Sequence, residues 1–441
     1  MNFDQPALPD EISLKDAVEF IVDNRGKTAP TEPNGIALIA TNCVNNVDLY
    51  PQKLNLRYVS QDTYDTWFRS HPVPGDILLT NKGSQNGAIC LVPSPVDFCI
   101  AQDMVALRAD PKKISPSYLF AALRSDLVQK RIKALNVDAV IPHLKKTDFN
   151  KLLIPLPDRK VQDSVGELYF ELSSRIELLR ETNATLEAIA QALFKSWFVD
   201  FDPVRAKLEG RAPEGMDEAT ARLFPDSFEE SELGLVPRGW RVGTLADLSD
   251  LNPESWSAKN HPDIVAYIDL ANAKDNEIAS VTDFEFDDAP SRARRVLRTG
   301  DTIVGTVRPG NRSFAFTHEP ASNLTASTGF AVLRPSVAAN TEFVYLAATQ
   351  DSSIEHLAHV ADGGAYPAVR PDVVSGLQCV VPNEQALEAF HLVAAPLLAK
   401  VSDNQAQAQT LAALRDTLLP RLISGQLRLP EAQAAFDAAL S

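Results

Sequence analysis

Apolar residues recur every three or four positions over a long stretch in the first half of the chain. From Val165 to Trp197 the spacing alternates strictly between four and three residues. The repeating positions are Val165, Tyr169, Leu172, Ile176, Leu179, Asn183, Leu186, Ala190, Leu193 and Trp197. A repeat kept over five heptads is typical of a coiled coil rather than of an ordinary amphipathic helix. The pattern therefore predicts a long helix over about residues 159–199.

The same pattern returns further along the chain, at the constant offset that takes Val165 to Phe390. It predicts a second long helix, over about residues 384–424. Eight of the ten shifted positions are compatible with a packed seam. These ten are Phe390, Ala394, Leu397, Val401, Asn404, Ala408, Leu411, Arg415, Leu418 and Leu422. Two such helices on one chain bury their apolar seams against each other if the chain folds back, which predicts an antiparallel pair.

Each seam contains one asparagine, and a buried polar residue commonly fixes the register of a coiled coil. Matching Asn183 with Asn404 places Trp197 opposite Phe390. The same register pairs Ile176 with Leu411 and Tyr169 with Leu418. The predicted interface consists of Leu172, Ile176, Leu179, Asn183, Leu186, Leu193, Trp197, Leu397, Val401, Asn404, Leu411, Leu418 and Leu422. The alternative is that both asparagines are simply tolerated near water.

The same offset also relates the segments that precede the two helices. Gly75-Asp76-Ile77-Leu78 matches Gly300-Asp301-Thr302-Ile303, and Ile154-Pro155-Leu156-Pro157 matches Cys379-Val380-Val381-Pro382. In the first copy, short apolar runs bounded by Pro, Gly and Asn predict strands. The runs are Gly35–Ala40, Asp76–Thr80, Ala88–Val92, Met104–Leu107 and Leu152–Leu156, and Ser115–Leu135 is helical in character. The chain is therefore a tandem duplication of a globular domain followed by a long helix.

The expected fold class is α+β, with two tandem α/β domains separated by a long antiparallel two-helix coiled coil in a pseudo-two-fold repeat. We expect a first domain over 1–157, and a first helix with an acidic connector over 158–236. A second domain covers 237–382, and a second helix with a tail covers 383–441. Asp202-Pro203 is expected to end the first helix, because proline and its predecessor resist helical geometry. The rest of the connector is expected to be loop, apart from a short helix at Asp217–Leu223.

Composition places the chain among soluble globular proteins, because no apolar run reaches the 18 or more residues of a membrane span. Met1–Ile12 has neither a basic nor an apolar region of a secretory signal, so we expect a cytoplasmic protein. Four widely spaced cysteines, Cys43, Cys90, Cys99 and Cys379, predict buried reduced thiols. The net charge of −16 argues against a simple basic nucleic-acid binder.

Positive charge is nevertheless concentrated locally. Residues 291–312 contain six arginines and one acid, and 124–151 contain seven bases and three acids. Basic and amide side chains on loops hold phosphates and read base edges, so we interpret these clusters as DNA-binding; the alternative is an ordinary solvated face. The candidates are Lys27, Lys82, Ser84, Gln85, Asn86, His143, Lys145, Lys146, Arg292, Arg294, Arg295, Arg308, Asn311, Arg312, Tyr366 and Arg370.

Catalytic motifs are absent from the sequence. Gly26-Lys27-Thr28 looks like the end of a phosphate-binding loop, but Ile21 stands where the upstream glycine is required. His356 and His359 lack a neighbouring Cys or Glu that would complete a metal site. No nucleophile elbow, dinucleotide fingerprint or adenine-methyltransferase tetrad occurs. We therefore expect no catalytic and no metal-binding residue.

Two variable globular units, each followed by a long helix, resemble the specificity subunit of type I restriction-modification systems. Local segments support the resemblance over essentially the whole chain: Ala192–Phe201 closes the first helix, Gly239-Trp240 opens the second unit, and Leu419–Gly425 closes the second helix. Phe194-Lys195-Ser196-Trp197-Phe198 is the most specific mark.

The resemblance implies that each globular unit is a target recognition domain that reads one half of a bipartite, asymmetric site in double-stranded DNA. The coiled coil would then set the gap between the halves. It also implies a chain without catalytic activity that scaffolds two modification subunits, which use S-adenosylmethionine, and two restriction subunits, which use ATP and Mg. No cofactor is expected on this chain itself. A rival hypothesis is a structural adaptor with two protein-binding domains on a coiled-coil strut.

Overall fold

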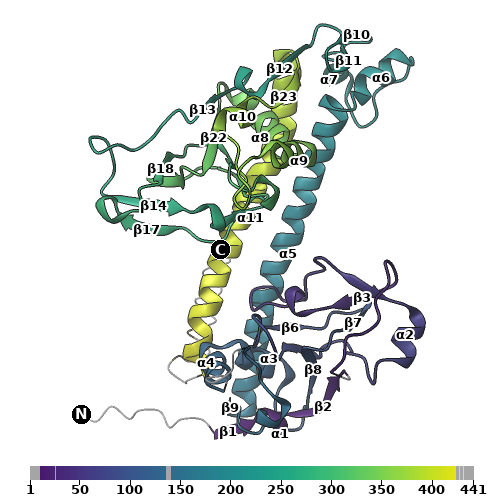
Figure 1. Ribbon diagram of the computed structural model, residues 1–441, viewed down its shortest axis with the longest axis vertical. Coiled ribbons are helices and arrows are strands. Elements are labelled where there is room, and N and C mark those ends of the chain that lie inside the picture. The colour runs from purple at the N-terminus through teal and green to yellow at the C-terminus, as the bar shows by residue number, and fades with distance from the viewer. Residues whose placement is uncertain (1–9, 25, 136–140, 424–426, 428–430, 432–441) are drawn as a thin grey trace. The chain divides into compact units, whose positions relative to one another are not determined.

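The computed structural model describes residues 10–24, 26–135, 141–423, 427 and 431. The chain divides into two compact units. Unit 1 consists of Met1–Arg180 together with Ala406–Ser441, and unit 2 consists of Glu181–Gln405. Each unit therefore contains part of both long helices, α5 (Arg159–Phe198) and α11 (Glu384–Ile423), which Figure 1 shows. Among the described residues, no helix has the length and apolar character needed to cross a membrane.

Unit 1 is built on an antiparallel four-stranded sheet and a smaller mixed sheet. The larger sheet has the order β2 (Val18–Asp23), β8 (Met104–Ala109), β5 (Ile77–Thr80) and β6 (Ile89–Leu91). The smaller has the order β4 (Arg57–Val59), β3 (Ile36–Ile39) and β7 (Phe98–Ile100), with β3 and β7 parallel. The strands β1 (Asp10–Ser13) and β9 (Leu153–Leu156) form a separate antiparallel pair. All four side chains of β5 are buried, as a continuous apolar run in a central strand predicts.

Helices cover unit 1 at several points. They are α1 (Leu14–Ala17), α2 (Gln61–Thr66), α3 (Pro116–Arg124) and α4 (Asp126–Ala134). The segment expected to be helical between Ser115 and Leu135 is two helices, because Ser125 has an extended backbone (φ −64°, ψ 146°). Its hydroxyl accepts a hydrogen bond from Val128 N (3.4 Å), so Ser125 caps the second helix.

Unit 2 repeats this strand order. Its first sheet runs β13 (Ser249–Leu251), β22 (Phe330–Pro335), β19 (Thr302–Gly305) and β20 (Phe314–Phe316). Its second runs β17 (Thr282–Glu285), β14 (Ile264–Ile268), β21 (Leu324–Ser327) and β18 (Ala293–Val296), with β14 and β21 parallel. The pair β12 (Arg241–Thr244) and β23 (Gln378–Val381) corresponds to β1 and β9. Between β22 and β23 lie the helices α8 (Thr341–Thr349), α9 (Asp351–Val360) and α10 (Pro371–Ser375).

A buried ion pair recurs at the same place in both units. The Asp76 carboxylate accepts hydrogen bonds from Arg108 Nε (2.9 Å) and Nη2 (3.0 Å), and Asp301 accepts two from Arg334 at 2.9 Å each. Both aspartates are almost fully buried. A fork of two parallel hydrogen bonds fixes orientation as well as distance. The Gly-Asp repeat found in the sequence therefore marks a common brace between the strands β5 and β8 and their counterparts β19 and β22.

The apolar seams of α5 and α11 are buried within each unit. In unit 1, Tyr169, Leu172 and Ile176 share a core with Leu411 and Leu418. In unit 2, Phe390 is fully buried, and its ring centroid lies 5.6 Å from that of Trp197 and 5.0 Å from that of Phe198. Aromatic rings packed edge to face at such distances contribute beyond their burial alone. Both parts of the helix pair thus belong to the hydrophobic cores of the units.

The two asparagines of the seams bond to each other inside unit 2. Asn404 Nδ2 donates to Asn183 Oδ1 (2.8 Å), and Asn183 Nδ2 donates to the carbonyl oxygen of Val401 (3.1 Å). Asn404 is 2% exposed and Asn183 is 8% exposed. The alternative of asparagines tolerated near water is therefore wrong, because both side chains are buried and satisfied within the helix pair.

The connector after α5 is more ordered than its composition indicates. α5 ends at Phe198, and Phe201 takes a left-handed conformation (φ 57°) before α6 (Asp202–Leu208) begins. Pro203 thus starts a helix rather than only ending one, since proline fits the first helical turn. The expected helix at Asp217–Leu223 is the shorter α7 (Glu218–Ala221), and a hairpin of β10 (Phe228–Ser231) and β11 (Gly234–Pro237) occupies a region expected to be loop.

The cysteines of the chain are free thiols. Cys43, Cys90 and Cys99 are buried, and Cys379 is partly buried. Burial raises the pKa of the Cys90 thiol to about 11 and that of Cys99 to about 12. These two thiols are therefore protonated and poorly nucleophilic at neutral pH.

Replacing one asparagine of the buried pair is expected to destabilise the protein more than replacing both. Asn183→Leu leaves Asn404 Nδ2 buried without an acceptor, which costs about 1–3 kcal/mol of unfolding free energy. The double variant with Asn404→Leu removes the unpaired group and fills the seam with apolar side chains. The measurement is a double-mutant cycle from urea denaturation of the full chain. Strictly additive losses would contradict the coupling.

Candidate nucleic-acid interface

Two loops are joined by main-chain hydrogen bonds at one edge of unit 1. The first follows β5, and the second contains Ile141-Pro142. Gly83 N donates to the carbonyl oxygen of Pro142 (3.0 Å), and Leu144 N donates to that of Asn81 (2.9 Å). Lys82 and His143 face each other in the resulting antiparallel bridge. We call this joined pair of loops the loop platform of unit 1, residues 81–87 and 141–144.

Unit 2 contains the same platform, formed by residues 306–312 and 366–369. Arg308 N donates to the carbonyl oxygen of Pro367 (2.7 Å), Val369 N donates to that of Thr306 (2.9 Å), and Val307 bridges Ala368. Each of these partners is related to its counterpart in unit 1 by the same offset that relates the two long helices. The backbone of the platform is therefore duplicated bond for bond, although its side chains differ.

Most of the predicted DNA-binding residues lie on or directly beside these platforms. In unit 1 they are Lys82, Ser84, Gln85, Asn86, His143, Lys145 and Lys146, and in unit 2 they are Arg308, Asn311, Arg312, Tyr366 and Arg370. The structure thus brings together residues from two separate sequence segments in each unit. Loops held by a rigid sheet are the usual position for recognition side chains.

Several platform side chains already have partners within the protein. Arg312 is paired with Asp275 (2.5 Å) and Asp351 (2.7 Å), Lys146 is paired with Asp23, and Asn86 Oδ1 accepts a hydrogen bond from Leu144 N (3.2 Å). These contacts shape the loops. The Arg370 side chain is 81% exposed, and its partner Asp372 lies at 3.1 Å. An exposed ion pair of this kind is weak and can exchange its carboxylate for a phosphate.

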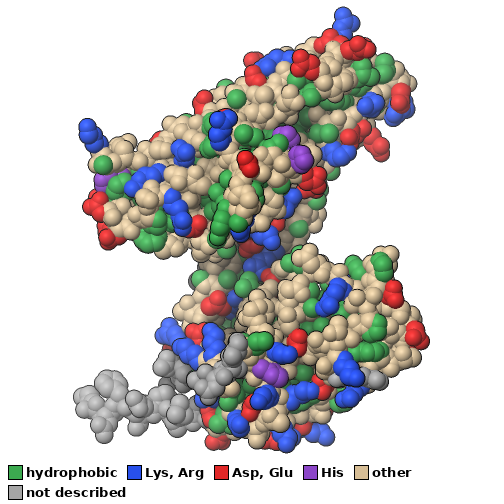
Figure 2. All heavy atoms as spheres, viewed as in Figure 1, with side chains coloured by type: hydrophobic (Ala, Val, Ile, Leu, Met, Phe, Trp, Pro, Cys, Tyr) green, Lys and Arg blue, Asp and Glu red, His purple; other side chains and the backbone are tan. Residues whose placement is uncertain are grey.

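The arginines in and next to β18 already have contacts within unit 2. Arg292 donates to the hydroxyl of Tyr267 and pairs with Asp269, and the Arg294 guanidinium lies 4.7 Å from the ring centroid of Phe286. Arg295 is partly buried; that burial lowers its pKa, and its Nη1 donates to Ser255 Oγ (3.3 Å). On the face shown in Figure 2, blue basic side chains lie in small groups among red acidic ones.

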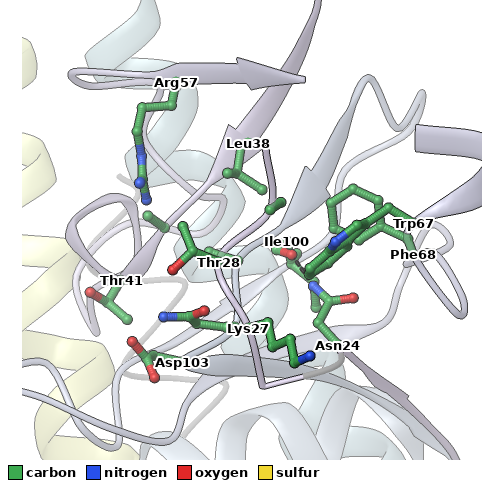
Figure 3. A pocket seen from close by; sticks show the side chains of 14 residues that line it. Asn24, Lys27, Thr28, Leu38, Thr41, Arg57, Trp67, Phe68, Ile100 and Asp103 are labelled. Carbon is green, nitrogen blue, oxygen red and sulfur yellow. Dashed lines mark hydrogen bonds between the residues drawn. The ribbon is translucent and has the colours of Figure 1, made fainter. Parts of the chain in front are cut away.

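Lys27 is not part of the platform loops. It lines a cavity of about 120 Å³ in unit 1, together with Asn24, Thr28, Leu38, Thr41, Arg57, Trp67, Phe68, Ile100 and Asp103 among others. Figure 3 shows Arg57 on one side of this cavity and Trp67 with Phe68 on another. The sequence groups Lys27 with the basic loop residues and gives no sign of the cavity, because the walls come from segments that are far apart along the chain.

Polar contacts tie the sheets of each unit to the part of the helix pair inside that unit. In unit 1, Arg180 Nη1 of α5 lies 2.9 Å from Asp48 Oδ1. In unit 2, Asn276 Nδ2 donates to Glu187 Oε1 of α5 (2.6 Å), and Gln405 Nε2 of α11 donates to the carbonyl oxygen of Asn276 (2.7 Å). These positioning contacts were missed from sequence; the Asp275-Asn276 pair indicates a turn but not its partners.

Burial raises the pKa of the Glu187 carboxyl above its ordinary value, and Asp275 raises it further, against the hydrogen bond from Asn276. A carboxyl with a raised pKa in the folded state contributes stability below its ordinary pKa of 4.5, and this contribution is lost as pH rises through the folded pKa. The buried charge of ionised Glu187 therefore destabilises the folded protein at neutral pH.

Glu187→Gln is therefore expected to raise the melting temperature at pH 7, because an amide oxygen still accepts the bond from Asn276 without a buried charge. The advantage over the wild type should shrink as pH falls toward 4.5. Thermal unfolding across this pH range measures the difference in melting temperature between the variant and the wild type. Glu181→Gln, at an exposed position of the same helix, is the matched control. If Glu187→Gln raised the melting temperature by the same amount at every pH, the raised pKa of Glu187 could not be the cause.

Comparisons with known proteins agree with this architecture. Residues 12–188 match the family model described as the type I restriction modification DNA specificity domain. The specificity subunit of the type I restriction enzyme HindI of Haemophilus influenzae is 25% identical over 401 residues, covering 80% of this chain and 86% of the relative. The MjaIX specificity subunit of Methanocaldococcus jannaschii is 22% identical over 370 residues, covering 81% and 78%.

The fold is also that of a solved relative. The S subunit of a type I restriction-modification system from M. genitalium superimposes with a TM-score of 0.55 at 15% identity, over 96% of this chain and 98% of that chain. Residues 12–188 thus form a DNA specificity domain of the type I restriction-modification class. Over about four fifths of its length, the chain is similar to the specificity subunits of type I restriction-modification systems.

Proposed function

We propose that each unit of this chain reads one half of a bipartite, asymmetric site in double-stranded DNA. The duplicated loop platform carries the proposal. Its backbone hydrogen bonds are the same in both units, whereas Lys82-Gly83-Ser84 in unit 1 corresponds to Val307-Arg308-Pro309 in unit 2. A constant frame with varied side chains is what two readers of different sequences require, since base edges are read by side chains.

The helix pair would set the gap between the two half-sites. Each helix contains 40 residues, which corresponds to a length of about 60 Å at 1.5 Å per residue. One turn of DNA is about 34 Å long, so a helix pair of this size suits a spacer of that order. The buried Asn183–Asn404 pair supports a single register, because a slip by one turn would leave both side chains unsatisfied.

The chemistry would belong to partner subunits. On this proposal the chain has no catalytic role and scaffolds two modification subunits, which bind S-adenosylmethionine, and two restriction subunits, which bind ATP and Mg. The match of residues 12–188 to the DNA specificity domain and the similarity to specificity subunits support this division. The chain's own contribution is to hold DNA at a defined position by loop side chains. With a net charge of −16, it would depend on the assembled complex for part of the positive surface around DNA.

Exchange of one unit tests this proposal. The chain is assembled with type I modification subunits, and bound sequences are selected from a random DNA library. Replacing residues 237–382 by the corresponding segment of a relative should change one half of the selected site and leave the other half and the gap unchanged. The matched control exchanges residues 1–157 and should change the opposite half.

The adaptor alternative predicts a different result. A strut with two protein-binding domains would select no sequence. Affinity for DNA should instead fall steeply with rising salt if the units neutralise phosphates. Changes in both halves after a single exchange would contradict independent readers.

A further inference from the structure

A single aromatic side chain projects from the platform of unit 2. Tyr366 is 70% exposed, and its backbone N donates to the carbonyl oxygen of Gly363 (3.1 Å). The loop is closed at its base by two hydrogen bonds between Asp362 and Ala368, of 2.8 and 3.1 Å. These bonds hold the backbone at Tyr366 in place, although most of the surface of this residue faces water.

One face of this ring lies against a cation. The guanidinium carbon of Arg308 is 4.6 Å from the ring centroid, and Arg308 Nη2 donates to the carbonyl oxygen of Ala365 (2.8 Å). The Arg308 backbone is left-handed (φ 49°), which is uncommon for a long side chain. Conformations of this kind persist where surrounding bonds enforce them, and they cluster at ligand contacts. Here the bond from Arg308 N to Pro367 holds the arginine beneath the ring.

Unit 1 presents an apolar side chain at the same point. Ile141 precedes Pro142 as Tyr366 precedes Pro367, and it is 56% exposed. Gly83, with φ 95°, stands at the position of Arg308 and brings no side chain. One exposed apolar residue is ordinary on a protein surface. Its recurrence at equivalent points of two diverged units, and the left-handed arginine that supports it in one of them, indicate a contact surface.

We propose that Tyr366, supported by Arg308, enters a base step of the half-site that unit 2 reads and stacks on a nucleobase there. Ile141 makes the corresponding apolar contact in unit 1. The inference rests on the proposed DNA-reading function and adds a specificity-determining residue to it. Stacking of a base on an aromatic ring contributes about 1–3 kcal/mol. The arginine under the ring is a cation within reach of the phosphates that flank the step.

Entry of the Tyr366 side chain into a base step would affect which DNA sequence unit 2 prefers. A side chain that enters between base pairs must first unstack them. Pyrimidine–purine steps unstack most easily, so a step of this kind is expected in the half-site of unit 2. The branched aliphatic side chain of Ile141 has no ring to stack, so the first half-site should depend less on such a step.

Variants of Tyr366 in the full chain, assembled with modification subunits, test the proposal. Tyr366→Ala should weaken binding to the selected site by about 5- to 150-fold, the equivalent of the stacking contribution, and Tyr366→Phe should retain most of the affinity. Val337→Ala, at a 58% exposed apolar position of the same unit, is the matched control and should leave affinity unchanged. Thermal unfolding of each variant confirms that its fold is intact.

A second readout separates a wedge from a merely structural role. A single mismatched base pair is moved through the half-site of unit 2, and its effect on affinity is compared between wild type and Tyr366→Ala. Where a mismatch removes a base contact made by other residues, the affinity of both proteins falls by the same factor. This effect therefore cancels when the two proteins are compared. At one step only, the mismatch should favour the wild type by several-fold, because it removes an unstacking cost that the alanine variant does not have. Ile141→Ala should show no such step in this half-site.

The remaining outcomes overturn the proposal. A wedge is excluded if Tyr366→Ala binds DNA as tightly as the wild type does. It is also excluded if the affinity lost by Tyr366→Ala is the same for mismatches at every position. Weaker assembly with modification subunits, with unchanged DNA affinity of the assembled complex, would show that Tyr366 contacts protein instead. If the wild-type complex itself selects no sequence, the proposed function fails and this inference falls with it.

Discussion

Burial of two long apolar helix faces is the constraint on which both units depend. A helix of 40 residues with an apolar stripe gains most of its stability from packing rather than from its own propensity. In unit 1 the first part of α5 packs with the last part of α11, and in unit 2 the remaining parts of the two helices pack together. The core of unit 1 therefore includes Leu411 and Leu418, which follow its sheets in the chain only after the whole of unit 2. Unit 1 cannot complete its core until nearly the whole chain is present.

On this helical base the same strand order appears twice, and the two copies keep their backbone more strictly than their side chains. In the braces Asp76–Arg108 and Asp301–Arg334 the aspartates are buried, and each brace is held by two hydrogen bonds. The platform bonds are likewise main-chain bonds, which do not depend on residue type. The same platform backbone therefore forms in both units although the side chains at most of its positions differ. Gly83 and Arg308 can thus occupy the same left-handed position with very different chemistry.

The features foreseen from sequence are those that depend on local spacing. Heptad periodicity predicted both helices to within a residue or so, and the two asparagines gave a register in which Trp197 and Phe390 are in contact. The constant offset between the two copies located the Gly-Asp strands and the strands that precede the two long helices. The first kind of signal comes from residues a few positions apart, and the second comes from the repeat within the chain.

Features that depend on distant partners were not foreseen. The arginines in and beside β18 count as positive charge in a sequence, but Arg298 pairs with Glu254, 44 residues away, and Arg292 pairs with Asp269. Glu187 and Asn276 are separated by 89 residues. The β10–β11 hairpin was missed because its first strand, Phe228–Ser231, is acidic and resembles a loop, and only Gly234, which takes a positive φ of 92°, indicates a turn. These features depend on contacts between residues that are far apart in the sequence. The spacing of residues along the chain does not reveal such contacts.

The most direct test of the whole account is a map of methylated adenines in the genome of a host that expresses this chain with type I modification subunits. Two readers on one helix pair predict a single non-palindromic motif of two specified parts with a gap of constant length, methylated in both parts. The central claim would be contradicted by a methylated motif without a gap, by a palindromic one, or by methylation that does not depend on this chain.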